Sequence, residues 1–583
     1  MVTRVAVIDR DLCIREKCGY VCQHVCPPNR IGEECIIIEK DSNYPVIYED
    51  VCIGCSLCVK KCPVDCISIV NLAEEKKKQF PIYQYSINTF RLYGLPLPKG
   101  GAVSLVGKNG IGKTTAIKLL SKQLSPNFAI LDHEPKESEI TDKLSLEERR
   151  YFSDIKTSMK VSHKPQHVDK LREVFKGKVT DLLKKISKDR YETAIDQFAI
   201  KEILQRDVSQ LSGGELQKVA IAVAYLKDAD IYYFDEFTNY LDIEERLRVG
   251  IVIKELSLSK SVVIAEHDLT LLDYVSDYVY LFYGDENVYG VVSGVKNVRA
   301  GINEYLAGLL KEENMRFRNH AIEFTRHSEG EIKSSPMLKY DGMKKTFDSF
   351  SFTSDKGELR KGEIVGIVGK NALGKSLFVK MLAGVDKSDE GESKIKLKVS
   401  YKPQYISAEN VTVNEVFASQ SLNIAILEEC KRKLKISSLM EKKLTELSGG
   451  ELQRIALCLA VSRDADVYLF DEPSAFLDVE QRFEFASLLR KVINESDKSA
   501  FVVDHDIVFI DAVANRLVVF DGKSSVKGHA SSPYSKKQGM NEFLKMVNVS
   551  MRRDKDSNRP RINKPGSALD SEQKGKGEYY YSS

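Results

Sequence analysis

Two short apolar segments, Ala102 to Val106 and Ile364 to Val368, set the pattern of this chain. Each is typical of a buried β-strand, and each is followed by a glycine-rich turn and then by residues at helical spacing. Two more apolar strands end in Asp235 and Asp471. Because this order of strands and helices occurs twice, the pattern predicts an α/β fold with two similar domains.

The first copy carries an insertion that the second copy lacks. Motifs late in the two copies are offset by 236 residues, whereas the glycine-rich turns are offset by 262. Most of this difference falls near residues 133–159, where Ser145 and Glu148 form a capping-box pattern ahead of apolar residues at helical spacing. We predict a small helical insertion, and we favour a role in partner docking over a plain surface excursion.

Composition narrows the class of protein. The chain has 583 residues, of which 29% are charged, and its apolar runs are too short to span a bilayer. We expect a soluble protein of several domains with no membrane segment. No signal-peptide pattern is present at the start, which predicts a cytoplasmic location. The net charge of +3 is too balanced to indicate nucleic-acid binding by itself.

Ten of the twelve cysteines lie within the first 66 residues. Eight of them form two runs that close with Cys-Pro, and the second run matches the C-x2-C-x2-C-x3-C-P pattern of bacterial ferredoxins. Two structural zinc sites are the alternative, but zinc sites usually keep two C-x2-C pairs apart. We predict a ferredoxin-like domain with two 4Fe-4S clusters. The expected ligands are Cys13, Cys18, Cys22, Cys26, Cys52, Cys55, Cys58 and Cys62.

In such runs the Cys-Pro cysteine serves the other cluster. This crossing groups Cys62 with the first three cysteines of the first run, and Cys26 with the first three of the second. Cys35 and Cys66 are expected to be buried free thiols. The two remaining cysteines, Cys430 and Cys458, lie in apolar helical segments and are expected in the core.

Both glycine-rich turns fit the P-loop pattern G-x4-G-K-[ST]. In that context the backbone N-H groups hold phosphates, the lysine reaches the terminal phosphates and the hydroxyl binds magnesium. We therefore expect ATP and Mg²⁺ at two sites, with Thr114 and Ser376 as magnesium ligands. The expected ATP-binding residues are Gly107, Asn109, Gly110, Gly112, Lys113, Thr114, Thr115, Gly369, Asn371, Gly374, Lys375 and Ser376.

Acidic pairs follow the strands behind each P-loop. Asp235 and Asp471 are expected to hold magnesium, and the adjacent Glu236 and Glu472 to polarise the attacking water. Four further residues are expected to sense the magnesium and the water or to contact the γ-phosphate. They are Gln166 and Gln404, each in a Lys-Pro-Gln run and also candidate magnesium ligands, and His267 and His505.

The segment Leu-Ser-Gly-Gly-Glu-Leu-Gln occurs in both copies, at 211–217 and 447–453. The whole ordered set resembles the ATP-binding cassette (ABC) family. That resemblance implies that each Ser-Gly-Gly caps the ATP of the opposite cassette, so the cassettes lie head to tail. Lys113 would then face Ser448, Gly449 and Gly450, and Lys375 would face Ser212, Gly213 and Gly214. The resemblance also implies that an aromatic residue stacks on each adenine, for which the candidates are Tyr85 and Tyr340.

Similar segments end both cassettes, at 301–306 and 539–544, and suggest a paired hinge. A basic run at 552–564 follows the second one. It could contact phosphate backbones or interdomain carboxylates, or be a solvated tail. The expected domains are residues 1–75 for the clusters, 76–295 for the first cassette, 296–335 for a hinge, 336–530 for the second cassette, and 531–583 for a hinge segment and basic tail.

Over essentially its whole length the chain resembles one family, the ABC subfamily E ribosome-recycling ATPases, also called RNase L inhibitors. Stretches such as Cys52-Ile-Gly-Cys55 and residues 558–564 carry the resemblance beyond the general ABC motifs. It implies a monomeric ATPase, without a membrane partner, that splits ribosomal subunits after termination or stalling. Its implied partners are the ribosome, mainly rRNA and proteins of the small subunit, a termination or rescue factor, and initiation factors.

Two other functions remain open from the sequence: the energising ATPase of a membrane transporter, and an ATP-coupled electron-transfer protein. The chain also departs from the family pattern. Glu236 is followed by Phe-Thr-Asn where the family, like the second cassette after Glu472, has Pro then Ser. The second P-loop has Ala372 where the first has Gly110. Neither change removes a ligand or a catalytic carboxylate, so both sites are expected to hydrolyse ATP, with unequal rates plausible.

Overall fold

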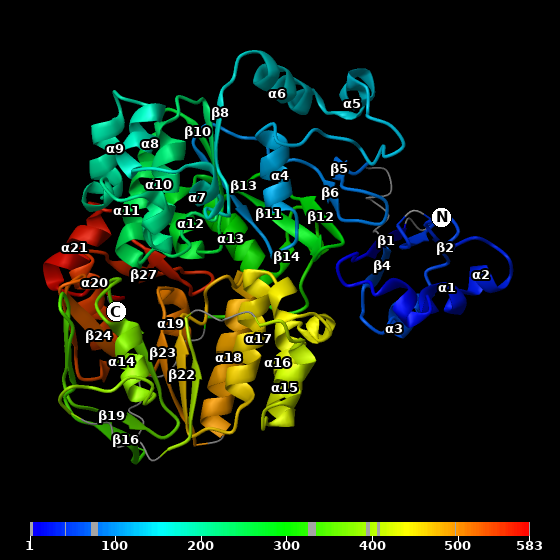
Figure 1. Ribbon diagram of the computed structural model, residues 1–583. Coiled ribbons are helices and arrows are strands. Elements are labelled where there is room, and N and C mark those ends of the chain that lie inside the picture. Colours follow the sequence, from blue (N-terminus) through cyan, green and yellow to red (C-terminus); the bar gives the residue numbers. More distant parts are fainter. Residues whose placement is uncertain are drawn as a thin grey trace.

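The computed structural model describes residues 4–40, 42–71, 80–324, 334–391, 397–404, 409–495 and 497–581. A small N-terminal domain lies beside two larger α/β domains, which are stacked on each other in Figure 1. The expected boundary between residues 75 and 76 and part of the expected hinge lie outside the described residues.

The N-terminal domain is built from short elements around its cysteines. One antiparallel pair joins β1 to β4 and another joins β2 to β3, while helices α1 and α3 pack on each other. The buried cysteines form one core with Ala6, Ile8 and Ile67. The elements are β1 (Arg4–Ile8), α1 (Val21–Val25), α2 (Pro27–Arg30), β2 (Ile36–Ile38), β3 (Pro45–Ile47), α3 (Leu57–Lys61) and β4 (Ile67–Asn71).

The first cassette is a nine-stranded mixed sheet in the order β5-β6-β12-β11-β7-β10-β9-β8, with β13 paired to β11. The central strands β7, β9 and β10 are parallel, and all of their residues except Ser261 are buried, which explains their mostly apolar sequence. The strands are β5 (Tyr83–Gln84), β6 (Arg91–Tyr93), β7 (Ala102–Val106), β8 (Val161–Lys164), β9 (Ile231–Asp235), β10 (Ser261–Ala265), β11 (Tyr278–Asp285), β12 (Tyr289–Val292) and β13 (Lys296–Asn297).

The helices of this cassette include the predicted insertion. Ser145 and Glu148 cap the second inserted helix reciprocally, and Tyr151 and Ile155 bury one face of it against the sheet. The helices are α4 (Lys113–Leu120), α5 (Glu137–Lys143), α6 (Leu146–Thr157), α7 (Lys170–Val174), α8 (Val179–Ile186), α9 (Tyr191–Phe198), α10 (Gly213–Leu226), α11 (Ile243–Leu256) and α12 (Leu269–Val275).

The second cassette repeats this sheet in the order β17-β18-β25-β24-β20-β23-β22-β21, with β26 paired to β24. A separate two-stranded sheet, β16 with β19, precedes it. The strands are β16 (Pro336–Tyr340), β17 (Lys344–Thr346), β18 (Ser351–Ser354), β19 (Gly357–Arg360), β20 (Ile364–Val368), β21 (Val399–Lys402), β22 (Val467–Asp471), β23 (Ser499–Val503), β24 (Arg516–Lys523), β25 (Lys527–Ala530) and β26 (Tyr534–Ser535). The helices are α14 (Lys375–Leu382), α15 (Val413–Ala418), α16 (Ile424–Leu434), α17 (Gly449–Ser462), α18 (Val479–Glu495) and α19 (Ile507–Val513).

The similar segments that end both cassettes are helical. Residues 301–306 lie in α13 and residues 539–544 in α20, and each helix packs on a strand of its own cassette, β11 or β24. The elements outside the two cassettes are α13 (Val298–Ala307), β14 (Leu309–Leu310), β15 (Met315–Arg316), α20 (Lys536–Met546), β27 (Met551–Arg553), β28 (Pro560–Ile562) and α21 (Ala568–Lys576).

A single asparagine of the first cassette fastens the N-terminal domain. Asn88 Nδ2 donates to the backbone oxygens of Ala6 and Ile47, both at 3.1 Å, and its Oδ1 accepts from Ile47 N at 2.8 Å. Arg91 adds an ion pair to Glu49 at 2.8 Å. The buried side chain of Asn88 therefore bridges β1 and β3.

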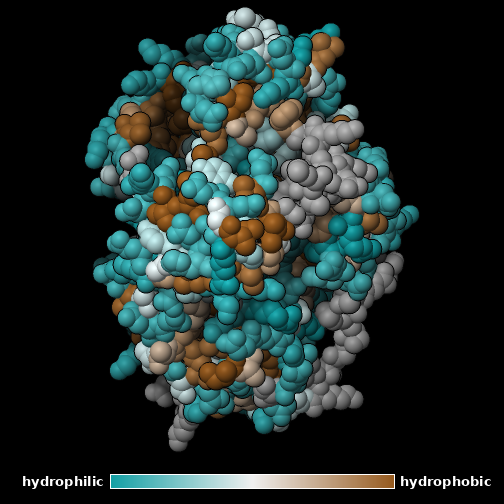
Figure 2. Space-filling view, turned by 90° about the vertical axis from the view of Figure 1, so that its right-hand side faces the viewer, coloured by the Kyte–Doolittle hydropathy of each residue, from teal (hydrophilic) through white to brown (hydrophobic). Residues whose placement is uncertain are grey.

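None of the helices described here combines the length and apolar character that a membrane span requires. Figure 2 faces the molecule from the side on which the N-terminal domain lies in Figure 1, and shows mostly hydrophilic residues with separate small hydrophobic areas.

Candidate functional site: two composite ATP sites and a cysteine-rich domain

The first P-loop and the signature segment of the second cassette face each other across a cavity of about 590 Å³. Residues 109–115 line one side, and Ser448, Gly449 and Gly450 line the other. Glu236 and Gln166 also reach this cavity. The two cassettes are thus arranged head to tail, as the resemblance to the ABC family implies.

Reciprocal contacts join each P-loop to the opposite cassette. Asn109 N donates to Asp478 Oδ2 at 3.1 Å, and Asn371 N donates to Asp242 Oδ2 at 2.8 Å. Ion pairs flank both contacts, from Lys108 to Glu480 and from Lys370 to Glu244. Both P-loops are therefore held by equivalent residues of the opposite cassette, namely the aspartate of its Leu-Asp pair and the glutamate two residues later.

The signature serines begin long helices. Ser212 and Ser448 cap α10 and α17 in reciprocal capping boxes with Glu215 and Glu451. The glycines at 213–214 and 449–450 form the first turn of each helix, where free backbone N-H groups and the helix dipole favour an anion. This local structure suits the predicted contact with a phosphate.

The P-loop lysines are buried and turn back on their own loops. Lys113 Nζ donates to the oxygens of Gly107 and Lys108 at 2.8 and 2.6 Å. Lys375 makes the same pair of bonds with Gly369 and Lys370. Burial lowers the pKa of Lys375 to about 8 and that of Lys113 in the same direction. A phosphate anion would relieve this cost, because it supplies the opposite charge.

The aspartates that end β9 and β22 fit a magnesium site. Oδ2 of Asp235 and both carboxylate oxygens of Asp471 are buried and accept no hydrogen bond from the residues that the structure describes. Burial raises the pKa of Asp235 to about 6, and the charge of Glu236 adds to the effect. Unpaired carboxylate oxygens are hard donors of the kind that Mg²⁺ prefers. The hydroxyl of Thr114 lies beside Asp235, so two of the three predicted magnesium ligands of the first site are neighbours.

The two glutamates that follow have left-handed backbones, with φ of 45° at Glu236 and 49° at Glu472. A left-handed backbone is strained in a residue that has a Cβ, and such strain is typical of functional sites. Gln166 Nε2 donates to Glu236 Oε1 at 2.9 Å, and Gln404 Nε2 donates to Glu472 Oε1 at 2.6 Å. The structure thus brings each predicted glutamine onto its predicted glutamate.

One histidine lies near the catalytic glutamate in each of these sites. His267 Nε2 lies 3.8 Å from Glu236 Oε1, and His505 Nε2 lies 3.4 Å from Glu472 Oε1. Burial lowers the pKa of His267 well below its usual range, so this imidazole is neutral. Burial opposes ionisation of Glu472, but the nearby His505, the hydrogen bond from Gln404 and the charge of Lys375 outweigh it and lower the pKa of Glu472 to about 2.

Of the two residues predicted to stack on adenine, one lines an ATP cavity and the other is buried. Tyr85 is 48% exposed and lines the first ATP cavity, with its hydroxyl 3.0 Å from Thr115 Oγ1. Tyr340 is only 3% exposed and packs edge-on against Phe378, so its ring is unavailable for stacking. The residue that matches Tyr85 in strand register is Phe347, which is 49% exposed. The P-loop offset of 262 residues leads from 85 to 347 and would have found it.

The cysteines of the N-terminal domain gather in two groups. Burial, together with the charges of Cys18, Cys13 and Cys62, raises the pKa of Cys22 to about 12. Burial, together with Cys52, Cys55 and Cys26, raises the pKa of Cys58 to about 11. These neighbours are the ones that the crossed arrangement would group. Within the described residues, no three His, Cys, Asp or Glu side chains form a site for a single metal ion; a 4Fe-4S cluster instead spreads its four thiolates over four irons.

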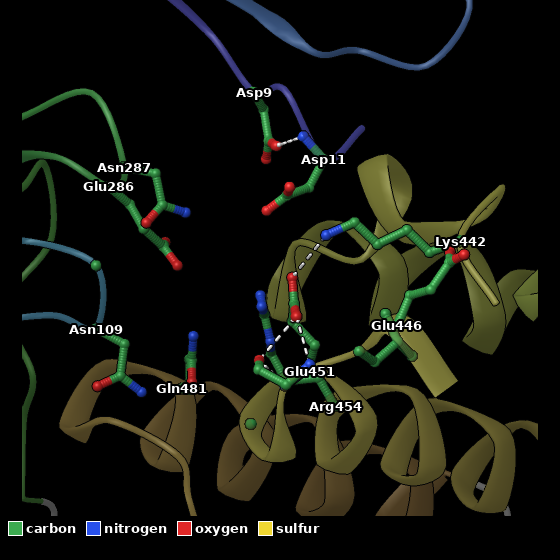
Figure 3. A pocket seen from close by; sticks show the side chains of 14 residues that line it. Asp9, Asp11, Asn109, Glu286, Asn287, Lys442, Glu446, Glu451, Arg454 and Gln481 are labelled. Carbon is green, nitrogen blue, oxygen red and sulfur yellow. Dashed lines mark hydrogen bonds and ion pairs between the residues drawn. The ribbon is translucent and has the colours of Figure 1, made fainter. Parts of the chain in front are cut away.

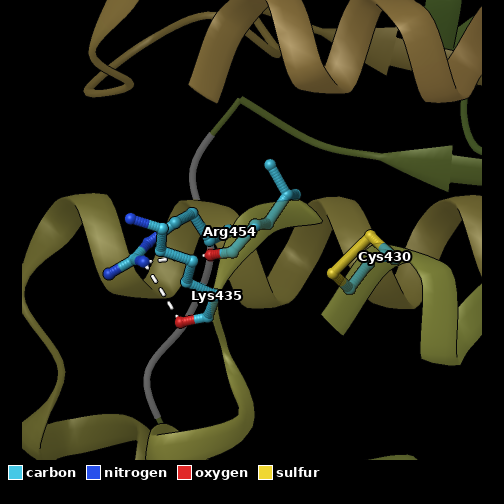
Figure 4. Close-up of a disulfide and its surroundings, with 5 residues drawn as sticks. Cys430, Lys435 and Arg454 are labelled. Atoms are coloured by element: carbon cyan, nitrogen blue, oxygen red, sulfur yellow. Dashed lines mark hydrogen bonds between the residues drawn. A yellow bond between two sulfur atoms is a disulfide. The ribbon is translucent and has the colours of Figure 1, made fainter. Parts of the chain in front are cut away.

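The four remaining cysteines are all buried, as the sequence predicts. Cys35 is 1% exposed and Cys66 is 5% exposed, with Cys66 Sγ 3.4 Å from Cys62 Sγ. Cys430 and Cys458 lie in the core, and they are joined by a disulfide between α16 and α17 that the sequence did not indicate (Figure 4).

A second cavity, of about 820 Å³, adjoins the first ATP site and shares its signature segment. Figure 3 shows Asp9 and Asp11 of the N-terminal domain on one side of it, and Lys442, Glu451 and Arg454 of the second cassette on the other. The N-terminal domain therefore lines a cavity that adjoins the first ATP site.

The basic run near the C-terminus contacts interdomain carboxylates. Arg559 is 1% exposed and lies 3.2 Å from Asp273 of the first cassette. Arg561 pairs with the same aspartate and with Asp554. The alternatives of a phosphate contact or a solvated tail do not describe these residues, because the aspartates already neutralise them.

Some residues of the sites were missed. Lys164 and Lys402, in the two Lys-Pro-Gln runs, donate to the backbone oxygens of Asp235 and Asp471, both at 2.9 Å. Burial lowers the pKa of both lysines to about 8. Each lysine lies two residues before a predicted glutamine, and this repeat in the sequence could have identified both of them. Asn239 also reaches the first site, where the sequence indicated only a departure from the family pattern.

Comparison with known proteins agrees with this architecture. The ABC transporter family model matches residues 92–239 and 352–475, and the 4Fe-4S binding domain model matches residues 45–68. An uncharacterised ABC transporter ATP-binding protein of Methanocaldococcus jannaschii is 46% identical over 99% of this chain and 97% of its own. Translation initiation factor RLI1 of Saccharomyces cerevisiae is 40% identical over 99% of this chain and 98% of its own.

Two solved structures are similar over most of the chain. One is a chain from a ribosome-bound assembly of archaeal Pelota and ABCE1, with a TM-score of 0.93, 45% identity and 100% coverage of both chains. The other comes from a complex of the archaeal ribosomal stalk protein aP1 with the archaeal ribosome recycling factor aABCE1. It has a TM-score of 0.81 and 43% identity, and the match covers 86% of this chain and 99% of that chain.

Proposed function

This chain belongs to the ABC subfamily E, or RNase L inhibitor, family, and from that membership we propose that it is an ATP-driven ribosome recycling factor. The observation that carries the proposal is the joining of a cysteine-rich domain to two head-to-tail ATP sites, at full-length similarity to ribosome-bound relatives. No observation favours a transporter ATPase or an electron-transfer protein.

The residues of each ATP site have distinct roles in hydrolysis. Glu236 and Glu472 accept a hydrogen bond from the attacking water, and Gln166 and Gln404 fix those carboxylates. His267 and His505 face the γ-phosphate as it leaves. Asp235 with Thr114, and Asp471 with Ser376, would hold Mg²⁺, which neutralises charge on the phosphates.

ATP would be enclosed between a P-loop and the opposite signature segment. Gly107, Gly110 and Gly112 in the first site, and Gly369 and Gly374 in the second, form the turns that expose backbone N-H groups to phosphates. Tyr85 and Phe347 would stack on the two adenines. One chain supplies both halves of both sites, which supports action as a monomer.

The N-terminal domain would carry two 4Fe-4S clusters. The first would be held by Cys13, Cys18, Cys22 and Cys62, and the second by Cys52, Cys55, Cys58 and Cys26, as the neighbours of Cys22 and Cys58 support. When bound, the clusters brace the domain as a rigid body; Cys26 and Cys62 tie its two halves together. The resemblance implies that ATP-driven closure of the cassettes swings this body against the ribosome.

We propose the ribosomal small subunit, together with a termination or rescue factor, as partner, and the cytoplasm as the place of action. The inserted helices α5 and α6 offer a partner-docking surface that the second cassette lacks. Initiation factors are further candidates, because a relative is named a translation initiation factor.

Sedimentation tests this function directly. The purified protein would be mixed with ribosomal subunits and a non-hydrolysable ATP analogue and run on a sucrose gradient. We expect it to travel with the small subunit, and to stay at the top of the gradient with ADP. A protein that stays at the top with both nucleotides contradicts the proposal. The Lys113→Ala plus Lys375→Ala variant, which removes both phosphate contacts, is the matched control.

A further inference from the structure

A fifth cysteine lies among the four expected ligands of the first cluster. Cys66 is 5% exposed, and its Sγ lies 3.4 Å from Cys62 Sγ. Its side chain also hydrogen-bonds to Cys13. A 4Fe-4S cluster takes four thiolates, so this group holds one cysteine more than the cluster requires. We propose that Cys66 is a reserve ligand of the first cluster, which binds iron in place of Cys62 when the sulfur of Cys62 is lost or detached.

The turn between Cys62 and Cys66 brings both sulfurs to the same place. Helix α3 ends at Lys61, and Asp65, whose backbone is left-handed with φ of 49°, turns the chain before β4 begins. The sulfur of Cys62 accepts backbone N-H bonds from Val64 and Cys66. The chain therefore wraps around this sulfur and returns the next cysteine to it. Exchange of one sulfur for the other needs a shift of the size that a change of side-chain rotamer supplies.

The partners of Cys66 distinguish it from a thiol that only fills the core, as a buried cysteine often does. The other spare cysteine, Cys35, contacts Cys26 and Cys52 of the second group. Its Sγ also lies 4.0 Å from the backbone oxygen of Tyr48, which is a non-sulfur acceptor. Within the described residues, every hydrogen bond of the Cys66 side chain is to a cysteine. Cys66 therefore faces only the atoms that hold iron in such clusters.

The exchange of ligands balances without an oxidant or a reductant. The bond from Cys62 Sγ to iron breaks, and a bond from Cys66 Sγ to the same iron forms. The proton of the Cys66 thiol passes to the departing sulfur of Cys62, so the group keeps four thiolates and one thiol. Because the two sulfurs are 3.4 Å apart, the proton passes between them directly.

The test counts iron in the full-length protein. Each variant would be reconstituted anaerobically with iron and sulfide, and its iron content would be measured together with its absorption and EPR spectra. We expect about eight irons per chain in the unaltered protein, in Cys66→Ala and in Cys62→Ala, because either sulfur completes the first cluster. Only the double variant, Cys62→Ala plus Cys66→Ala, should fall to about four irons.

Cys18→Ala is the matched control, because Cys18 belongs to the same expected ligand group. Its side chain hydrogen-bonds to the backbone oxygen of Arg15 at 3.0 Å and, in the described part of the chain, not to Cys66. Cys18→Ala should therefore fall to about four irons although Cys66 is present. About four irons in Cys62→Ala alone, or about eight in the double variant, would overturn the inference.

A second measurement does not require the Cys62→Ala chain to fold. With all the expected ligands in place, Cys66→Ala and Cys66→Val should release iron to a ferrous chelator about tenfold faster than the unaltered protein, because a detached Cys62 sulfur is no longer replaced. Valine fills the space of Cys66 and lacks the thiol. Equal rates in all three proteins would overturn the inference. Faster release in Cys66→Ala alone would indicate a lost core contact and would also overturn it.

The inference rests on the proposed pair of clusters, and the iron counts separate the two. An unaltered chain with clearly fewer than about eight irons would contradict the clusters themselves. About eight irons in the unaltered chain and about four in Cys62→Ala would overturn the reserve role of Cys66 alone. Sedimentation with ribosomal subunits is a separate measurement of the proposed function.

Discussion

The two cassettes share the order of their strands and differ in what surrounds their phosphate sites. Both sheets run through eight equivalent strands in the same order, and both P-loops are held by equivalent aspartates of the other cassette. Around this frame the first cassette carries the inserted helices, Asn239 and the attached cysteine domain. The comparison teaches that the ATP-binding frame is duplicated, whereas single side chains and attached segments around it differ.

The largest effect is expected from the contacts between the C-terminal segment and the two cassettes. Asp273 and Asp511 occupy matching places in α12 and α19. Asp273 binds Arg559 and Arg561, and Asp511 binds Lys536 and Arg553. The segment therefore grips both cassettes at the same position.

Asp273→Ala should lower the free energy of unfolding by about 4 kcal/mol, because it leaves the buried Arg559 without its partner. Urea denaturation would measure the change. Asp228, whose side chain is 82% exposed, pairs with Lys160 at the surface; Asp228→Ala is the control and should change stability by less than about 1 kcal/mol. Equal losses of stability in the two variants would show that the buried ion pair between Arg559 and Asp273 contributes no more than a surface ion pair.

The disulfide is the next difference. Cys430 and Cys458 match Ala194 and Ala222 of the first cassette, which are fully buried. The disulfide joins residues 28 apart in sequence, so its loss in Cys458→Ala should destabilise the second cassette by about 3 kcal/mol. Thermal unfolding with and without a reductant would measure this.

Reduction of the unmutated protein should reproduce the loss, and Cys458→Ala should be insensitive to the reductant. If reductant lowered the stability of both proteins equally, the effect would belong to other thiols, such as those of the N-terminal domain.

These residues show which features could be predicted from the sequence and which could not. P-loops, strand-ending acids and signature segments are local patterns, so the sequence predicted them, whereas the head-to-tail pairing was implied by the resemblance to the ABC family. The grip of Arg559 on Asp273 joins positions 286 apart in the numbering, and no local pattern reports such a contact. The choice of Tyr340 as the adenine-stacking residue was wrong for a related reason. A tyrosine near the start of a cassette can lie in the core or stack on adenine, and only the strand register points to Phe347 instead.

The smallest expected effect concerns one residue of each P-loop. Gly110 and Ala372 both have left-handed backbones, with φ of 68° and 58°. A Cβ at Gly110 would lie 2.3 Å from Asn287 Oδ1. In the second cassette the residue that bonds to this turn through its N-H is Ser525, which has a shorter side chain. The methyl of Ala372 is thus accommodated where that of an alanine at 110 would not be.

Gly110→Ala should therefore destabilise the first cassette by about 1 kcal/mol, from left-handed strain and from displacement of Asn287. Adding Asn287→Ser, which copies the second cassette, should recover the part caused by the overlap and leave the strain. The reverse change, Ala372→Gly, should be stabilising by about 0.5 kcal/mol, because relief of strain is partly offset by the greater freedom of glycine in the unfolded chain. Chemical denaturation measures all three, and a failure of Asn287→Ser to rescue Gly110→Ala would show that backbone strain alone separates the two loops.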